Sequence, residues 1–265
     1  MKNRVKALTA VLALLTVASV YSQFGQRPGG RGMGGPPRGP DLGGAMGKLF
    51  GNNSAFSATM ESQMTSPSGE QNMTMTGKLA FDNGQSRFEM DMSEMKGAQR
   101  PPEATAQMKA MGMDKMVSIT VPDKKVVYLV YPNLQAYVEN PIQNQEVAKS
   151  ESDFKVEITE LGKEAVDGHP CVKNKAVVTD KEGNKHESTV WNATDLKNFP
   201  IKIETTEQAH KMTMLFKDVK LSKPDASLFE PPSDCKKYDN FMSLMMQQGM
   251  RGMGRGGMGA PPGQQ

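Results

Sequence analysis

The chain has 265 residues, 37% of them hydrophobic, which suits one domain of ordinary size with additional terminal segments. Its formal charge of +3 comes from Lys2, Arg4 and Lys6, because the remaining 29 basic residues balance 29 acidic ones. This balance excludes the basic surface typical of nucleic-acid binding, so we expect no nucleic-acid partner.

Residues 1–22 have the organisation of an export signal. A basic start is followed by an apolar run from Ala7 to Val20 and by the small residue Ser22. The run is too short to span a bilayer comfortably, and no later segment approaches the roughly 20 apolar residues of a transmembrane helix. No cysteine follows the run, which excludes a lipoprotein signal. We therefore expect a cleaved signal peptide, no transmembrane span, and a mature protein that is periplasmic or secreted.

Two segments are too poor in large apolar residues to fold. Residues 23–51 are rich in Gly, Pro and Arg, and residues 249–265 are rich in Gly, Met and Arg. Such compositions bury too little apolar surface to offset backbone entropy, so both segments are predicted to be disordered.

Between these segments, apolar and polar residues alternate with period two, which predicts antiparallel strands. In the second strand, Met73, Met75, Gly77, Leu79 and Phe81 share one face. Turn residues separate the segments, and the sequence at 82–84, Asp-Asn-Gly, predicts a tight hairpin. The predicted strands cover residues 56–64, 73–81, 88–92, 116–121, 126–131, 154–159, 163–167, 171–179, 185–191, 200–206 and 211–216. An antiparallel sheet of about ten strands must curl or close.

Two helices are predicted beside this sheet. The first starts near Pro101 and Pro102, because proline is tolerated in the first turn of a helix. The second covers residues 237–248, where Tyr238, Phe241 and Met245 lie on one amphipathic face. This organisation assigns residues 52–236 to the β domain, on which both helices are expected to pack.

Cys171 and Cys235 are the only cysteines. In an oxidising compartment two cysteines can form a disulfide, and no Cys-x-x-Cys spacing indicates a redox pair. We therefore expect a structural Cys171–Cys235 bridge.

The last third of the chain resembles exported bacterial proteins with a LolA/LolB-like fold. These include a domain family of unknown function and the outer-membrane lipoprotein-sorting proteins. The matching segments are Gly168-His169-Pro170-Cys171, residues 190–196, Phe199-Pro200-Ile201, residues 216–219 and residues 224–232. The resemblance implies a mainly β (α+β) fold, in which a strongly curved antiparallel sheet forms an unclosed half-barrel. One or two helices pack in or over its concave face, which leaves an apolar groove.

Methionine is unusually frequent, with 22 residues, none of them between Val117 and Lys211. Methionine can simply fill a core, or it can provide an adaptable surface for acyl chains and other apolar partners. A third interpretation is a Cu(I) site, because thioethers favour this ion and the runs Met90–Met92, Met108–Met116 and Met242–Met246 resemble thioether arrays. The candidate apolar groove comprises Met60, Met73, Met75, Met90, Met108, Met111, Met212, Met214 and Phe216.

No catalytic or metal-binding motif accompanies these residues. The three histidines lie far apart in sequence, and no Gly-x-Ser-x-Gly nucleophile motif occurs. We therefore expect a non-enzymatic protein without cofactor or bound metal, which holds a lipid, an acyl chain or another hydrophobic small molecule. A cell-envelope protein is a further expected partner. The alternatives are a Met-rich periplasmic Cu(I)-binding protein and a structural envelope protein that assembles through its tails.

Overall fold

The computed structural model describes residues 44–66, 72–97, 102–142, 154–207 and 210–247. The predicted signal peptide, most of the predicted N-terminal disordered segment and the whole C-terminal tail lie outside these residues, and these three assignments remain predictions.

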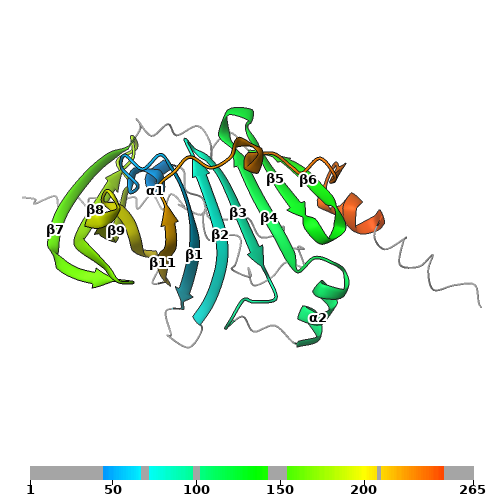
Figure 1. The fold of residues 1–265 in the computed structure, drawn as a ribbon, viewed down its shortest axis with the longest axis horizontal. Coiled ribbons are helices and arrows are strands. Elements are labelled where there is room, and N and C mark those ends of the chain that lie inside the picture. The colour runs from blue at the N-terminus through cyan, green and yellow to red at the C-terminus, as the bar shows by residue number, and fades with distance from the viewer. Residues whose placement is uncertain (1–43, 67–71, 98–101, 143–153, 208–209, 248–265) are drawn as a thin grey trace, which may run out of the picture. The chain divides into compact units, whose positions relative to one another are not determined.

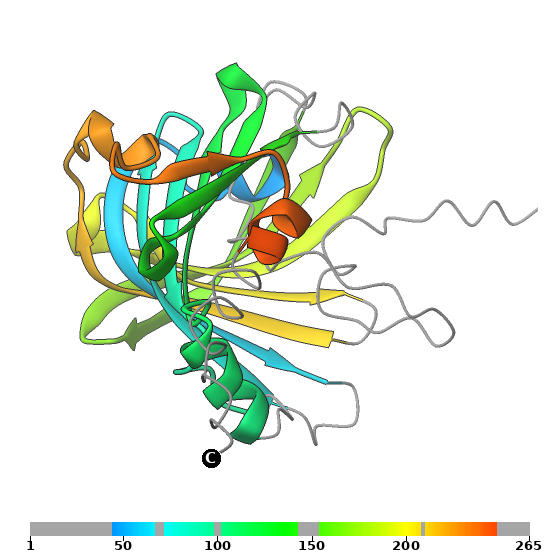
Figure 2. The same ribbon diagram turned by 90° about the vertical axis from the view of Figure 1, so that its right-hand side faces the viewer.

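The described strands form one sheet of 12 strands in the order β12-β6-β5-β4-β3-β2-β1-β11-β10-β9-β8-β7. Every neighbouring pair is antiparallel except β12, which pairs parallel with β6. The sheet is strongly curved and unclosed, as Figures 1 and 2 show. The predicted mainly β fold with a curved antiparallel sheet is therefore confirmed.

The elements succeed one another along the chain with few helical interruptions. Their bounds are α1 (Gly44–Lys48), β1 (Ala55–Thr65), β2 (Asn72–Asp82), β3 (Gln85–Asp91), α2 (Pro102–Ala110), β4 (Lys115–Val121), η1 (Pro122–Lys124), β5 (Val126–Tyr131), η2 (Pro132–Leu134), β6 (Ala136–Pro141), β7 (Lys155–Val166), β8 (His169–Thr179), β9 (Lys185–Ala193), η4 (Thr194–Leu196), β10 (Phe199–Glu207), β11 (His210–Lys220), η5 (Ala226–Phe229) and β12 (Lys236–Tyr238). A last helical segment covers residues 241–247.

Tight turns connect the strands where the sequence supplies residues that tolerate positive φ. Asn83 (φ 47°) and Gly84 (φ 88°) join β2 to β3, which confirms the predicted hairpin. The turns η1 and η2 share a different design, in which proline opens a 3-10 turn and the residue after it is left-handed. Lys125 (φ 52°) and Gln135 (φ 46°) occupy these left-handed positions.

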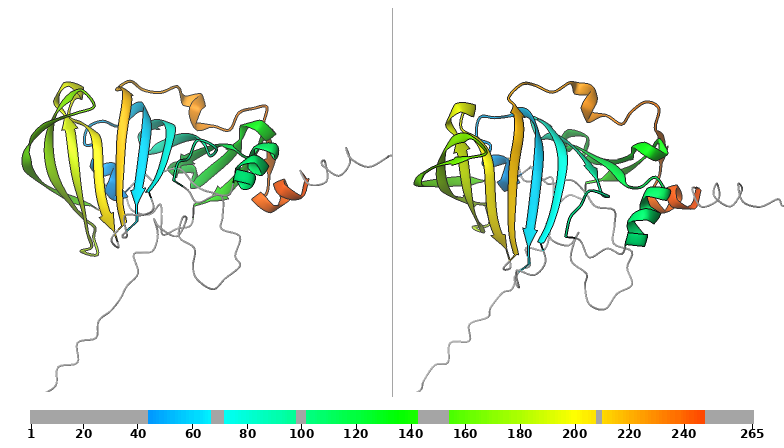
Figure 3. Two further views of the ribbon diagram at one scale, coloured as in Figure 1. Left: turned by 90° about the horizontal axis from the view of Figure 1, so that it is seen from below. Right: turned by 60° about the horizontal axis from the view of Figure 1, so that its bottom comes forward.

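The main core lies on the concave face of the sheet. One continuous cluster includes Phe154 and Val178 near the β7 end of the strand order and Val138 and Tyr238 at the β12 end. A cluster that draws on both ends of a curved sheet must lie on its inner side. Figure 3 shows α2 and the helical segment 241–247 at the β4–β6 end of the sheet. Leu244 of the helical segment is fully buried in the main core, and Met108 of α2 packs against it.

The opposite face of β3 to β6 has its own smaller core. Val117, Ile119 and Val130 are buried there beneath Phe229 of η5. Arg87 of β3 fastens this connection, because its Nη1 donates a hydrogen bond of 3.1 Å to the carbonyl oxygen of Leu228. The segment that returns from β11 to β12 therefore covers the convex side.

Three predicted boundaries are wrong. The strands predicted at 154–159 and 163–167 are one long strand, β7 (Lys155–Val166), with a register shift between Glu160 and Gly162. Residues 44–51 are not disordered, because they form α1 and bury Phe50 in the core. Tyr238 does not start a helix but pairs with Val138 in β12, and the helix begins only at residue 241.

Candidate functional site

The concave face brings most of the predicted groove residues together. Four of them are buried in the main core: Met60, Met90, Met214 and Phe216. Three are half-buried and pack against that core: Met75, Met108 and Met212. Met73 is half-buried at the start of β2. Met111 does not join the group, because it follows α2 and is 38% exposed.

Strand register explains this arrangement. Met60 of β1 lies opposite Gly77 of β2 and Phe216 of β11. Two residues further along β1, Ser62 lies between Met75 and Met214. The concave face therefore changes from a closed core at Met60 to a half-buried thioether surface near the end of β1.

Aromatic rings fill the other end, and of these only Phe216 was predicted as a groove residue. Phe50 stacks on Phe56 with ring centroids 5.0 Å apart, and Phe56 meets Phe199 edge-on at 4.9 Å. Phe81 and Phe216 complete this group. Such offset and edge-on contacts are the favoured geometries of aromatic pairs. The aromatic cluster fills the concave face at the α1 end, and the half-buried methionines lie at the opposite end, called here the methionine end.

One buried polar group of the described residues on the concave side lacks a hydrogen-bond partner. Tyr131 at the end of β5 is 2% exposed, and its ring lies beside Phe241, with centroids 6.0 Å apart. Among the described residues, its hydroxyl is the buried side-chain polar atom without a hydrogen-bond partner. Burial raises the pKa of Tyr131 above its ordinary value of about 10. No sequence pattern singles out Tyr131, because tyrosine is common in strands.

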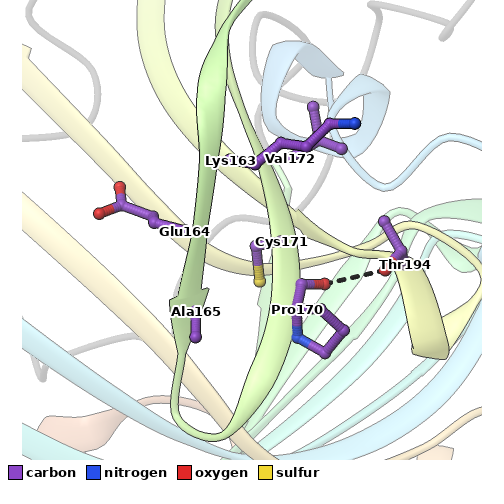
Figure 4. Close-up of a pocket in the computed structure, with 7 residues that line it drawn as sticks. All are labelled: Lys163, Glu164, Ala165, Pro170, Cys171, Val172 and Thr194. Carbon is purple, nitrogen blue, oxygen red and sulfur yellow. Dashed lines mark hydrogen bonds between the residues drawn. The ribbon is translucent and has the colours of Figure 1, made fainter.

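A separate pocket of about 370 Å³ lies between β7, β8 and η4 (Figure 4). The hydroxyl of Thr194 donates a hydrogen bond of 3.1 Å to the carbonyl oxygen of Pro170 at its edge. Its lining residues are Lys163, Glu164, Ala165, Pro170, Cys171, Val172 and Thr194. These residues come from two strands and one turn.

The groups at this pocket stabilise the strands and are poorly suited to catalysis. The carboxylate of Glu164 points away from Cys171 (Figure 4). It accepts a hydrogen bond from Nε1 of Trp191 and forms a 3.3 Å ion pair with Lys173. These two hydrogen bonds lower the pKa of Glu164. His169 is paired outside the lining, with 2.7 Å between its Nδ1 and Oδ2 of Asp195.

Both cysteines are free thiols, so the structure lacks the predicted Cys171–Cys235 bridge. Cys171 lies on β8 in a cluster with Trp191, whereas Cys235 precedes β12 and packs against the convex-side cluster. Nine strands separate β8 from β12 in the sheet order. A disulfide needs Cα atoms within about 7 Å, which these positions do not provide. Burial raises the pKa of the Cys171 thiol, which disfavours the reactive thiolate.

The methionine runs that suggested a Cu(I) site are distributed over several elements. Met90 lies opposite Met116 inside the core, whereas Met108 lies in α2 and Met111 follows that helix. Met242 and Met246 are 54% and 59% exposed on the helical segment 241–247. Within the described ranges, no three His, Cys, Asp or Glu residues are grouped so that they could hold a metal ion.

None of the helices that the structure describes is long and apolar enough to cross a membrane. This finding is limited to the described part of the chain.

Three solved structures are similar to this chain at low identity. A LolA superfamily protein from Nitrosomonas europaea is 9% identical, with a TM-score of 0.38 over 71% of this chain and 98% of its own. The lipoprotein LppX from Mycobacterium tuberculosis is 8% identical, with a TM-score of 0.40 over 65% of this chain and 91% of its own. LprF from Mycobacterium bovis is 10% identical, with a TM-score of 0.39 over 73% of this chain and 100% of its own.

No curated protein matches the sequence. A family model does match it, from residue 56 to residue 199, which is more than half of the chain. The match begins with Phe56 in β1 and ends with Phe199 in β10, so it includes Phe56, Phe81 and Phe199 of the aromatic cluster. The chain belongs to the family described as "Domain of unknown function (DUF4412)".

Proposed function

We propose that the concave face binds a lipid, an acyl chain or another hydrophobic small molecule, which enters at the methionine end. The observation that carries this proposal is the change in burial along β1 and its neighbours. Met60 and Met214 are buried, whereas Met75 and Met212 are half-buried and continue the same apolar surface toward solvent. A ligand chain placed on these residues would extend an existing core and remove apolar surface from water.

The chemistry of methionine supports an elongated, variable ligand. Its unbranched side chain has several rotatable bonds and a polarisable thioether, so it adapts to ligands of different shape. A surface of branched side chains would adapt less to the shape of the ligand. We therefore infer a class of acyl-chain ligands and not one rigid compound.

Tyr131 supports a polar group on this ligand. Met90 of β3 lies opposite Met116 of β4. The next residue of β4, Val117, lies opposite Val130 of β5, which directly precedes Tyr131. Tyr131 is therefore two strands away from Met90. A buried hydroxyl that gains a hydrogen-bond partner recovers the free energy lost on desolvation. A carboxylate or ester oxygen of a lipid is a suitable acceptor.

We propose a binding protein and not an enzyme. The state of Cys171 supports this, because burial raises the pKa of its thiol and so disfavours the nucleophilic thiolate. Its Sγ instead donates a hydrogen bond of 3.4 Å to the carbonyl oxygen of His169. The predicted export signal supports a location in the periplasm or outside the cell, where the protein would deliver its ligand to, or take it from, a cell-envelope partner.

Native mass spectrometry of the protein purified from cells tests the proposal. We expect adducts with lipid masses, which disappear after delipidation and return when long-chain fatty acid is added. A protein that carries no lipid and takes up none after delipidation would contradict the proposal.

A further inference from the structure

Three methionines from distant parts of the sequence form a row across three neighbouring strands. Met64 of β1 lies directly opposite Met73 of β2 on one side and Met212 of β11 on the other. All three are half-buried, so their side chains are accessible from solvent. Directly opposed residues have Cβ atoms about 4.5–5.5 Å apart, which lies within the reach of flexible methionine side chains.

The composition of this end of the sheet is unusual. On β1, β2 and β11, the apolar side chains of this row and of the adjacent row, where Ser62 lies between Met75 and Met214, are all thioethers. Outside these three strands the concave face includes branched aliphatic residues such as Leu129, Val190 and Ile203, the last of which lies opposite Met214. Branched residues serve equally well for filling space on strands and are favoured there.

We propose that Met64, Met73 and Met212 form a binding site for a soft monovalent metal ion, Cu(I). Thioethers select Cu(I) over harder ions such as Mg²⁺ and Ca²⁺. Met64 lies between the other two, so the three sulfur atoms can converge on one ion held at the centre of the row. Met75 and Met214 lie in the next row and shield the ion on the side of the core.

This site differs from the thioether arrays that the sequence indicates. Those arrays rely on short spacings within one segment, whereas the row combines residues 9 and 148 positions away from Met64, in β2 and β11. The proposal is also independent of lipid binding, because the ion needs the sulfur atoms and an acyl chain needs only the apolar surface.

Anaerobic Cu(I) titration against a chromophoric Cu(I) chelator tests the proposal. The test variant is Met64→Leu/Met73→Leu/Met212→Leu, which keeps apolar character and approximate volume. The matched control is Met111→Leu/Met242→Leu/Met246→Leu, which removes three exposed thioethers elsewhere. We expect the test variant to bind the tightest Cu(I) equivalent at least about tenfold more weakly, a loss typical of changes around a metal site. The control should match the parent protein.

Equal Cu(I) affinity of the test variant and the parent would overturn the proposal, as would an equal loss in both variants, because binding would then be spread over the chain. NMR of ¹³C-methyl-methionine in the unmutated protein gives a second reading that does not depend on variant folding. The methyl signals of Met64, Met73 and Met212 should shift together at the first equivalent of Ag(I), a redox-stable substitute. Separate shifts at different equivalents would also contradict the proposal.

Fatty-acid uptake by the same test variant separates the two proposals. Uptake should persist when Cu(I) binding is lost, since leucine keeps the surface apolar. A failure of lipid binding in the parent protein would leave the Cu(I) result unaffected.

Discussion

Tyr131 combines deep burial with an unpaired hydroxyl, and both properties have measurable consequences. A buried hydroxyl without a partner destabilises the ligand-free protein by about 1–3 kcal/mol relative to an apolar group of the same shape. Phenylalanine retains the ring that lies beside Phe241 and removes only the hydroxyl.

We predict that Tyr131→Phe raises the free energy of unfolding by about 1 kcal/mol at neutral pH. The raised pKa of Tyr131 adds a pH dependence. The folded protein keeps the proton at a pH where the unfolded chain, with a pKa of about 10, loses it. The free energy of unfolding of the parent protein is therefore unaffected by this residue's titration below pH 10 and falls by about 1.4 kcal/mol per pH unit above it. The variant lacks the hydroxyl and does not show this fall.

Urea unfolding at pH 7 and at pH 11 measures both effects for Tyr131→Phe. An advantage of the variant that grows with pH would support the burial of an unpaired hydroxyl. The same difference at both pH values would contradict it.

Gly77 is the residue that allows the centre of the concave face to pack. A Cβ atom at this position would lie 2.4 Å from Cζ of Phe88 and 2.5 Å from the carbonyl oxygen of Glu89. The ring of Phe88 therefore occupies the space that any other residue would need.

We predict that Gly77→Ala lowers the free energy of unfolding by about 1–3 kcal/mol, because the Phe88 ring and the β3 backbone must move. Lys78→Ala is the matched control, since Lys78 is exposed on the opposite face of the same strand. The control should stay within about 0.5 kcal/mol of the parent protein. Chemical denaturation measures both, and equal stabilities of the two variants would refute the packing role of Gly77.

At the scale of elements, the position of each cysteine follows from the strand order. Cys171 belongs to β8 and Cys235 directly precedes β12, with nine strands between them. The two residues therefore cannot pair within one chain without rearranging the sheet.

We predict two free thiols per chain in unreduced, unfolded protein. In the native protein Cys235, which is half-buried, should react with a thiol reagent before Cys171, which is 3% exposed. Labelling with a mass tag measures both. The absence of free thiols in the unfolded, unreduced protein would show that the bridge exists.

Most strands could be predicted from the sequence because their alternation is regular. Residues 126–131 and the Asn83-Gly84 turn agree with the structure, since both depend on local periodicity and local turn chemistry. The elements that were missed depend on distant contacts. Phe50 follows a glycine-rich segment, and its burial depends on ring contacts with Phe56 in β1 and Phe199 in β10.

The same distinction applies to β12 and to the candidate site. The three residues of β12, which begin at Lys236, have no strand pattern of their own. They pair with β6 because the segment between β11 and β12 crosses the convex side and ends beside that strand. Alternation in β2 predicts that Met73 and Met75 share one face of the strand, which the register with β1 confirms. Only the register with β1 and β11 shows that Met73, Met64 and Met212 lie side by side.

At the scale of the whole described domain, the concave face has one filled end and one open end. The aromatic cluster around Phe50 fills the first, and half-buried thioethers form the second. This polarity is the physical basis of the proposed function, because a ligand chain can extend the core only where the core is incomplete.

Titration with a dye-labelled long-chain fatty acid tests this claim most directly. We compare the parent protein with Met75→Glu/Met212→Glu at the open end and with Met242→Glu/Met246→Glu, which places the same charges on exposed positions. Covering an unpaired carboxylate with an acyl chain is strongly unfavourable, and each 1.4 kcal/mol weakens binding about tenfold. We predict at least a tenfold (about 1.4 kcal/mol) loss of affinity for the first variant and none for the second. Equal affinity of the three proteins would contradict the placement of the ligand on the concave methionine surface.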